Sequence, residues 1–321
     1  MDEIINNLNK ASGIHKKIRN DLRGIIKANT KLIDISNFIE KQTRLYSGKD
    51  EINSGIAFPP GLSLNNIAAH WAPQKNDMTK LKNSDVLKID FGVHKNGCII
   101  DSAFTWSRNP IYDMLLESSR DAVYKVIKMI GVDTSISDIG TLVEEIVESY
   151  EIEKKGILYP VRPIRNICGH SIKPWVIHGG KYIQNIQNND NTRIEDNDII
   201  AIEVYTTDGI GKTYMGKNNS HFMLNSCVPK NFRCDLSRRT EEMLYTINNN
   251  FKTLPFTQKY LDTISPVRYY DPCLEELYSK GLLKKYPPLI EYDKQSRVAQ
   301  FEHTLLVTEK NNINFSISDD Y

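Results

Sequence analysis

Hydrophobic residues recur at two different spacings along this chain, and the spacing changes several times. In residues 1–47 they recur near a helical period, which predicts two helices, the second over 33–46. Further helical patterns lie at about 112–130, 136–151 and 237–285. The pattern therefore predicts helices at both ends of the first half and a long helical stretch late in the chain.

Between the helical patterns the chain carries short β-rich runs with turn signals, over 55–110 and 157–225, and a last strand in AQFEHTLLV. A faint repeat links the two blocks. LKNSDVLKID (81–90) aligns with IEDNDIIAIE (194–203), 113 residues later, so that a turn aspartate leads into a strand ending on a carboxylate twice. Chance could produce so short a match, but helices followed by a β block in each half favour a duplicated α+β half-domain.

Composition adds little to this picture and excludes several classes of protein. The 321 residues are 25% charged and 40% hydrophobic with a formal net charge of +1, which is ordinary for a globular domain. Nothing in that balance indicates a specific nucleic-acid partner. We expect no membrane span and no signal peptide, since no apolar run is long enough. Five cysteines without CxxC spacing indicate a reducing compartment, and we expect a cytoplasmic protein.

Two aspartates can be placed by turn chemistry. Asn96-Gly97, between IDFGVHK and CIIDSAF, is a two-residue hairpin signal. If those residues form the loop, Asp101 lies opposite Gly92 and diagonal to Asp90, with the two carboxylates on one face. Carboxylates so close repel unless one is protonated or cations lie between them. A solvated hairpin face with two acids is the alternative.

Three further residues are candidate partners of these aspartates: His170 in CGHSI, Glu203 in AIEVY and Glu302 in QFEHT. Taken singly, each has a plainer interpretation, such as a core histidine or an edge-strand charge. Taken together, four carboxylates and one imidazole would balance two divalent cations. Such an oxygen-rich set suits Mn, Fe(II), Co or Zn.

At this point the chain resembles the methionine aminopeptidases, and within them type 2. The resemblance spans residues 55–321 and is carried, in order, by GIAFPPGLSLNNIAAHWAP, LKIDFGVHKNGCIIDSAFT, ESYE, VRPIRNICGHSI, VIHGGK, IAIEVY, NSHFM, KKYPPL and AQFEHTLLV…DDY. It implies a pseudosymmetric pita-bread fold, with residues 1–321 as one catalytic domain. The helical stretch at 230–290 matches the insertion that separates type 2 from type 1.

The resemblance also implies roles for individual residues. Asp90, Asp101, His170, Glu203 and Glu302 would bind two divalent metal ions, with Asp101 and Glu302 bridging them. Glu203 would double as general base. His70 matches the histidine that faces the leaving group and reacts with fumagillin-type epoxides, and His178 the one that steadies the tetrahedral intermediate. Phe58, Ile177 and His221 match the methionine pocket.

The implied reaction is hydrolysis of the bond after an N-terminal methionine when the second residue is small, with a bridging metal-bound hydroxide as nucleophile. Partners would be the N-termini of newly made proteins, and a transient ribosome contact is left open. An X-prolyl aminopeptidase or dipeptidase, or a catalytically dead binding protein of this fold, are the alternatives; GIAFPPG and NSHFM argue against the first and the complete ligand set against the second.

The chain departs from the family pattern in a few places. It starts almost at the catalytic domain, without the long charged extension of many eukaryotic type 2 enzymes. Pro174 and Trp175 stand between two site histidines, and Val204-Tyr205 follow Glu203, so both segments could change the pocket shape. Of the remaining histidines, His15, His94 and His303 fall outside the motifs, and we expect them to be structural or exposed.

Overall fold

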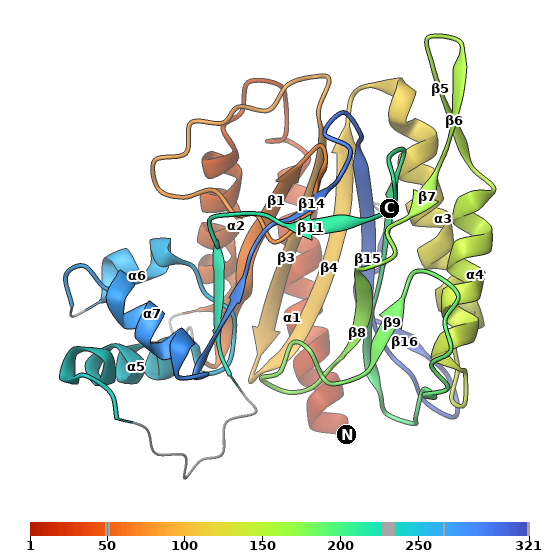
Figure 1. The fold of residues 1–321 in the computed structure, drawn as a ribbon. Helices are drawn as coiled ribbons and strands as arrows, with labels where there is room; N and C mark the ends of the chain where they lie inside the picture. Colours follow the sequence, from red (N-terminus) through yellow and green to blue (C-terminus); the bar gives the residue numbers. More distant parts are fainter. Residues whose placement is uncertain (49, 51, 226–234, 266, 320–321) are drawn as a thin grey trace.

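The computed structural model describes most of the chain, namely residues 1–48, 50, 52–225, 235–265 and 267–319 (Figure 1). Residues 230–234 and 266 of the predicted insertion, Cys227, Cys234 and the last two residues of the DDY segment lie outside these ranges. No helix among the described residues is long and apolar enough to cross a membrane.

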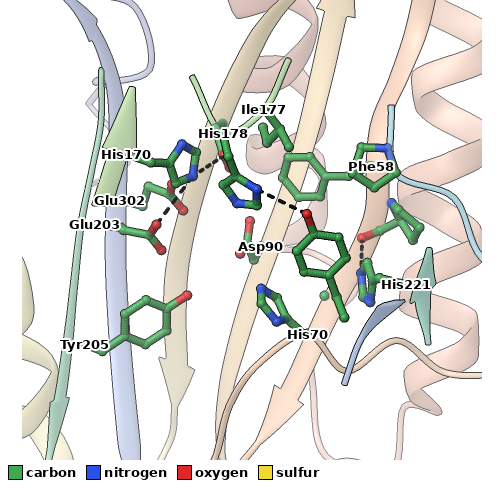
Figure 2. A pocket seen from close by; sticks show the side chains of 15 residues that line it. Phe58, His70, Asp90, His170, Ile177, His178, Glu203, Tyr205, His221 and Glu302 are labelled. Atoms are coloured by element: carbon green, nitrogen blue, oxygen red, sulfur yellow. Dashed lines mark hydrogen bonds and ion pairs between the residues drawn. The ribbon is translucent and has the colours of Figure 1, made fainter. Parts of the chain in front are cut away.

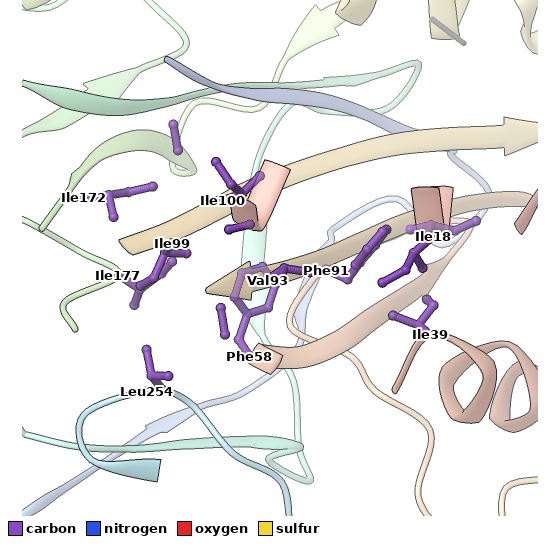
Figure 3. Packing of buried hydrophobic residues seen from close by; sticks show 14 of the residues in the cluster. Ile18, Ile39, Phe58, Phe91, Val93, Ile99, Ile100, Ile172, Ile177 and Leu254 are labelled. Carbon is purple, nitrogen blue, oxygen red and sulfur yellow. The ribbon is translucent and has the colours of Figure 1, made fainter. Parts of the chain in front are cut away.

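The N-terminal half is an antiparallel sheet of order β1-β3-β4 packed against two helices (Figure 1). Its elements are α1 (Asp2–Leu22), α2 (Leu32–Ser47), β1 (Ser54–Leu64), β2 (Ile67–Ala69), β3 (Val86–Lys95) and β4 (Cys98–Ser107). The two predicted helices are confirmed. Ile18 of α1 and Ile39 of α2 are buried in one cluster with Phe91 of β3, so the helical spacing of apolar residues covers the sheet (Figure 3).

The second half repeats this arrangement with a larger sheet of order β16-β15-β10-β8-β9, with β7 also pairing with β10. Helices α3 and α4 pack against it, and the predictions at 112–130 and 136–151 are confirmed to within a few residues. The elements of this half are η1 (Pro110–Tyr112), α3 (Asp113–Met129), α4 (Ile136–Glu148), β5 (Glu151–Lys154), β6 (Ile157–Pro160), β7 (Arg162–Pro163), β8 (Cys168–Ile172), β9 (Tyr182–Gln184), β10 (Ile199–Thr207), β15 (Val298–Leu306) and β16 (Ile313–Asn314).

Between β10 and β15 the chain leaves the two halves and returns. It forms β11 (Thr213–Met215), β12 (His221–Leu224), α5 (Arg238–Phe251), α6 (Gln258–Ile264), α7 (Asp271–Ser279), β13 (Leu283–Tyr286) and β14 (Leu289–Glu291). The helical prediction for 237–285 is confirmed for three helices with non-helical connections between them, and it is wrong beyond Ser279. Gly281, at φ +72°, follows the end of α7, and the next residues pair with β12 instead.

The predicted carboxylate hairpin is confirmed in its register. Asn96 and Gly97 both have positive φ, as a two-residue hairpin turn of this kind requires, and Lys95 pairs with Cys98. Asp101 therefore lies opposite Gly92. A Cβ atom on Gly92 would come within 2.3 Å of the Phe58 ring, so only glycine leaves room for that ring beside the aspartates.

The predicted repeat is also confirmed, down to its turns. The Asp85 carboxylate accepts a hydrogen bond from the Lys82 N–H at 2.8 Å, and the Asp198 carboxylate accepts one from the Glu195 N–H at 2.8 Å. In each half the strand that follows, β3 or β10, lies between two antiparallel neighbours. The duplication thus places Asp90 and Glu203 at equivalent positions of equivalent strands.

Strands β4 and β15 lie against each other where the two halves meet, but they belong to separate sheets (Figure 1). Side-chain hydroxyls replace the backbone ladder between them. Thr304 Oγ1 accepts from the Asp101 N–H at 2.8 Å and donates to the Asp101 carbonyl at 2.6 Å. Ser102 donates to the Glu302 carbonyl at 2.8 Å, and Thr105 to the Gln300 carbonyl at 2.7 Å. We call Ser102, Thr105 and Thr304 the hydroxyl seam.

Removing one seam hydroxyl should loosen this junction. Thr304→Val leaves the buried Asp101 N–H without its acceptor, and we expect the free energy of unfolding to fall by about 1–3 kcal/mol. Thr304→Ser keeps the hydroxyl and loses one methyl group, so it should cost about 1 kcal/mol or less. Urea denaturation of both variants measures the difference, and equal midpoints would show that the hydroxyl contributes nothing.

Candidate functional site

All ten residues predicted for the site line one cavity between the two halves (Figure 2). They are Phe58, His70, Asp90, Asp101, His170, Ile177, His178, Glu203, His221 and Glu302. The same cavity is also lined by Pro59, Gly61, Tyr205, Pro255 and Tyr286. The cavity therefore gathers side chains from both halves and from the segment between β10 and β15.

The four carboxylates are supplied by four strands. Asp90 and Asp101 come from the β3–β4 hairpin, and Glu203 and Glu302 are cross-strand partners on β10 and β15. The hydroxyl seam brings the two pairs together, because it fixes β4 against β15 at the level of Asp101 and Glu302. The structure of either half alone does not determine where its two carboxylates lie relative to the other two.

His170, on β8, faces the carboxylates. Its Nε2 lies 3.6 Å from both Asp101 Oδ2 and Glu203 Oε1. Its Nδ1 lies 3.3 Å from the Ser171 carbonyl, which can only accept a hydrogen bond, so Nδ1 is the protonated nitrogen. Burial lowers the pKa of His170 to about 4, so the imidazole is neutral and Nε2 is free to act as a ligand.

Burial and mutual repulsion dominate the electrostatics of the cavity. Burial raises the pKa of Asp90 to about 7. Burial, followed by the charges of Asp90 and Glu203, raises the pKa of Asp101 well above its usual range. Burial and the charge of Asp90 raise the pKa of Glu203, and burial and the charges of the other three carboxylates raise the pKa of Glu302. An arrangement of four buried carboxylates is therefore unfavourable without a cation.

The donor set fits divalent metal ions. One ligand atom each from Asp101, His170 and Glu302 lie within 4.8 Å of one another. Asp90 Oδ1 is buried and has no hydrogen-bond partner among the described residues, as expected of an oxygen reserved for a cation. Carboxylate oxygens with one imidazole form a hard, mixed O/N site.

Three more histidines, His70, His178 and His221, line the cavity. His178 packs edge-on against His170, with ring centroids 4.6 Å apart, and its Nδ1 lies 3.4 Å from the Tyr286 hydroxyl. His221 Nε2 is bound to the Pro59 carbonyl at 3.1 Å. His70 adopts φ 60°, a conformation in which non-glycine residues are uncommon and which often marks functional sites. Burial is the first cause that lowers the pKa of His70 and His178 to about 3 and that of His221 to about 4.

The apolar part of the wall is continuous with the protein core. Phe58 and Ile177 are 9% and 4% exposed and belong to the same cluster as Ile99 and Leu254 (Figure 3). Because the core holds these two side chains, the wall is rigid where a substrate side chain would contact it.

The sequence profile of metallopeptidase family M24 matches residues 6–309. The chain belongs to metallopeptidase family M24. Three relatives cover the M24 chain almost completely. It is 40% identical over 317 residues to methionine aminopeptidase 2 of Komagataella phaffii, and the alignment covers 98% of this chain and 70% of that protein. It is 42% identical to methionine aminopeptidase 2 of Saccharomyces cerevisiae (98% and 76%) and 40% identical to methionine aminopeptidase 2A of Arabidopsis thaliana (99% and 71%).

Solved structures with the same fold are more distant in sequence. A thermophilic Arx1 superposes with a TM-score of 0.81 at 14% identity, over 100% of this chain and 92% of that one. A methionine aminopeptidase from Thermotoga maritima superposes with a TM-score of 0.66 at 17% identity, over 99% and 98%. With these neighbours and the M24 match, the predicted pseudosymmetric pita-bread fold is confirmed.

The remaining predictions about this M24 chain have mixed outcomes. His15, His94 and His303 were expected to be structural or exposed. They are buried and do not line the cavity, so they are structural. Pro174 and Trp175 do not line the cavity within the described part of the chain. Trp175 instead stacks under the Lys252 ammonium, 3.6 Å from its ring centroid.

Sequence reasoning gave no role to several residues of the site. Tyr205, which was singled out because it follows Glu203, does line the cavity. Gln300, which donates to two of the carboxylates, was discoverable because it lies two positions from Glu302 on the same strand. Tyr286 lay in the motif KKYPPL but was given no role. Pro255 carries no local signal, since only the packing of the α5–α6 connection brings it to the cavity.

The raised pKa of Asp90 makes a stability prediction for the metal-free protein. Because its folded-state pKa, about 7, lies above the usual value near 4, its contribution to stability is full below pH 4 and is lost as pH rises through 7. Asp90→Asn should therefore stabilise the metal-free protein at pH 8 by a few kcal/mol and change it little at pH 4.5.

Thermal unfolding in the presence of a chelator measures this difference. Asp34→Asn, which alters an exposed carboxylate on α2, is the matched control and should behave alike at both pH values. If Asp90→Asn destabilised the metal-free protein at pH 8, the cavity would already balance that charge with its own residues.

Proposed function

We propose that this chain removes the N-terminal methionine from polypeptides whose second residue is small, as a two-metal methionine aminopeptidase. The observation that carries the proposal is that one cavity combines four carboxylates, a ligand-like imidazole, three further neutral histidines and a rigid apolar wall. Relatives about 40% identical over nearly the whole chain are named methionine aminopeptidase 2.

Asp90, Asp101, His170, Glu203 and Glu302 would hold two divalent ions. When bound, such ions supply Lewis acidity and make a water molecule nucleophilic at neutral pH. The donor set suits Mn, Co, Fe(II) and Zn alike.

The residues of this chain carry out the proton transfers and position the substrate. Glu203 takes the proton of the attacking water and passes it to the leaving amine. His178 donates to the oxygen of the scissile carbonyl as negative charge develops there, and its imidazole is held near the Tyr286 hydroxyl. His70 faces the leaving group. Each of these roles needs a neutral imidazole or a free carboxylate oxygen at the start of the reaction.

Phe58, Ile177 and His221 would form the methionine pocket. The Phe58 ring is fixed by its fit against Gly92, and the His221 ring is fixed at both nitrogens, by Ser220 and by the Pro59 carbonyl. A narrow slot with immobile walls accepts the unbranched thioether chain and penalises branched side chains.

Residues 1–321 would act as one catalytic domain, with 230–290 as an insertion ending in strands. Its helices have their own apolar cluster, and Lys259 of α6 ties them to α2 by an ion pair of 2.6 Å with Glu40. Cys98, Cys168 and Cys273 are free thiols, which agrees with a reducing, cytoplasmic location. The ribosome contact stays a prediction.

Substrate preference tests the proposed function. Met-Ala-Ser and Met-Gly peptides should be cleaved at least about 10-fold faster than Leu-Ala peptides, because one misplaced branch costs that much in a hydrophobic pocket. Met-Lys peptides should also be cleaved more slowly, because crowding beyond the scissile bond favours a small second residue. Asp101→Asn, which removes one of the four site carboxylates, is the inactive control. Peptide release is measured by chromatography. Equal kcat/KM on Leu-Ala-Ser and Met-Ala-Ser would refute the assignment, and so would faster cleavage of Ala-Pro-Ala than of Met-Ala-Ser.

Covalent labelling tests the position of His70. Burial lowers the pKa of His70 to about 3, so its imidazole is neutral at pH 7. A neutral, nucleophilic ring therefore lines the cavity. We expect a fumagillin-type epoxide to add once, at His70. His70→Asn should prevent labelling without straining the backbone, since asparagine tolerates the positive φ found there.

Intact-mass measurement and peptide mapping locate the adduct. A modification on another residue, or none while methionine release proceeds normally, would show that the pocket differs from the type 2 pattern.

A further inference from the structure

The cross-strand pair beside Glu203 and Glu302 on the same face of the sheet is also polar. Glu203 and Glu302 are cross-strand partners on β10 and β15, and two residues further along the same face the partners are Tyr205 and Gln300. Both side chains are buried, with 2% and 1% exposure. A polar pair so deep in a protein needs hydrogen-bond partners, and here the partners are the site carboxylates.

Gln300 contacts two carboxylates from different halves of the molecule. Its Nε2 lies 3.3 Å from Asp90 Oδ2 and 3.2 Å from Glu302 Oε2. A carboxylate only accepts hydrogen bonds, so the amide nitrogen, with its two N–H groups, is the atom that must face this pair. The backbone of Gln300 is fixed on both sides by the Thr105 hydroxyl, which limits any shift of the amide.

Tyr205 serves the remaining glutamate. Its ring lines the cavity below Glu203 (Figure 2). A hydrogen bond from its hydroxyl is one of the causes that act on the pKa of Glu203, which it lowers, so the hydroxyl lies beside that carboxylate. The ring belongs to a small apolar cluster with Ala68, Ile164 and Val298, so the hydroxyl is held in place. A phenol can donate one hydrogen bond, and the carboxylate is the acceptor.

These donors leave other carboxylate oxygens unoccupied. Gln300 takes Asp90 Oδ2, while Asp90 Oδ1 is buried without a partner in the described structure. Four carboxylates that repel one another would otherwise rotate apart in the absence of a cation. Donors beneath them oppose that rotation and keep the free oxygens aimed into the cavity.

We propose that Tyr205 and Gln300 form a donor rung, a pair of positioning residues that hold Glu203, Glu302 and Asp90 in the orientation needed to bind divalent cations. The proposal rests on the proposed function, since it assigns this rung to the same metal site. It makes the floor of the cavity part of the binding apparatus, although neither residue is itself a ligand.

Calorimetric titration of the chelator-treated, metal-free protein with Mn²⁺ or Co²⁺ tests the donor rung without any turnover. Tyr205→Phe and Gln300→Leu keep the packing volume and remove the donors. We expect each to weaken cation binding by about 10–100-fold, the usual effect of losing a group that orients a ligand. Two matched controls remove the same bond types elsewhere: Tyr150→Phe, whose hydroxyl binds Asp121 at 3.0 Å, and Gln258→Leu, whose amide binds Asp271 at 2.6 Å.

Thermal unfolding of the metal-free variants separates positioning from packing. Wild-type cation affinity in both rung variants would overturn the proposal, and a lower unfolding temperature with unchanged affinity would assign the rung to packing alone. Should Gln300→Leu not fold, Tyr205→Phe, which lacks a single oxygen atom, still decides. If the wild-type protein itself binds no divalent cation, the two-metal function fails instead, whatever the variants do.

Discussion

Four carboxylates that share one buried cavity repel one another, and the rest of this structure accommodates that repulsion. The strands that carry them are fixed independently of the site, by a tight hairpin turn on one side and an extended antiparallel ladder on the other. The hydroxyl seam then holds the two pairs close even though their charges favour separation. Divalent cations complete an arrangement that the fold has already imposed.

The duplication explains how one chain produces such a site economically. Each half supplies the same device, an aspartate-closed turn followed by a strand with a carboxylate on its inner face. Two copies facing each other give a nearly symmetric set of acids. The asymmetry needed for catalysis comes from outside the repeat, from the histidines and from the segment that contributes His221 and Tyr286.

Sequence reasoning worked where local chemistry decides the structure. The Asn96-Gly97 turn fixes its own register, so the relation of Asp90 to Asp101 could be read from a dozen residues. It failed where distant pairing decides. Strand β13 exists because β12 offers it an edge, and the role of Gln300 depends on which strand lies beside β15. No periodicity within either segment contains that information, whereas the resemblance to a family supplied the ligand set at once.

The hydroxyl seam also bears on how the protein assembles. Its bonds join residues about 200 positions apart, such as Asp101 and Thr304, which are separated by 203, while the β3–β4 hairpin closes over two residues. Contacts that close long loops form late, because their entropy cost precedes their reward. Until that step each half carries only two of the four acids. A partly folded chain is thus a poor chelator, and tight capture of metal becomes a property that the protein acquires only when folding is complete.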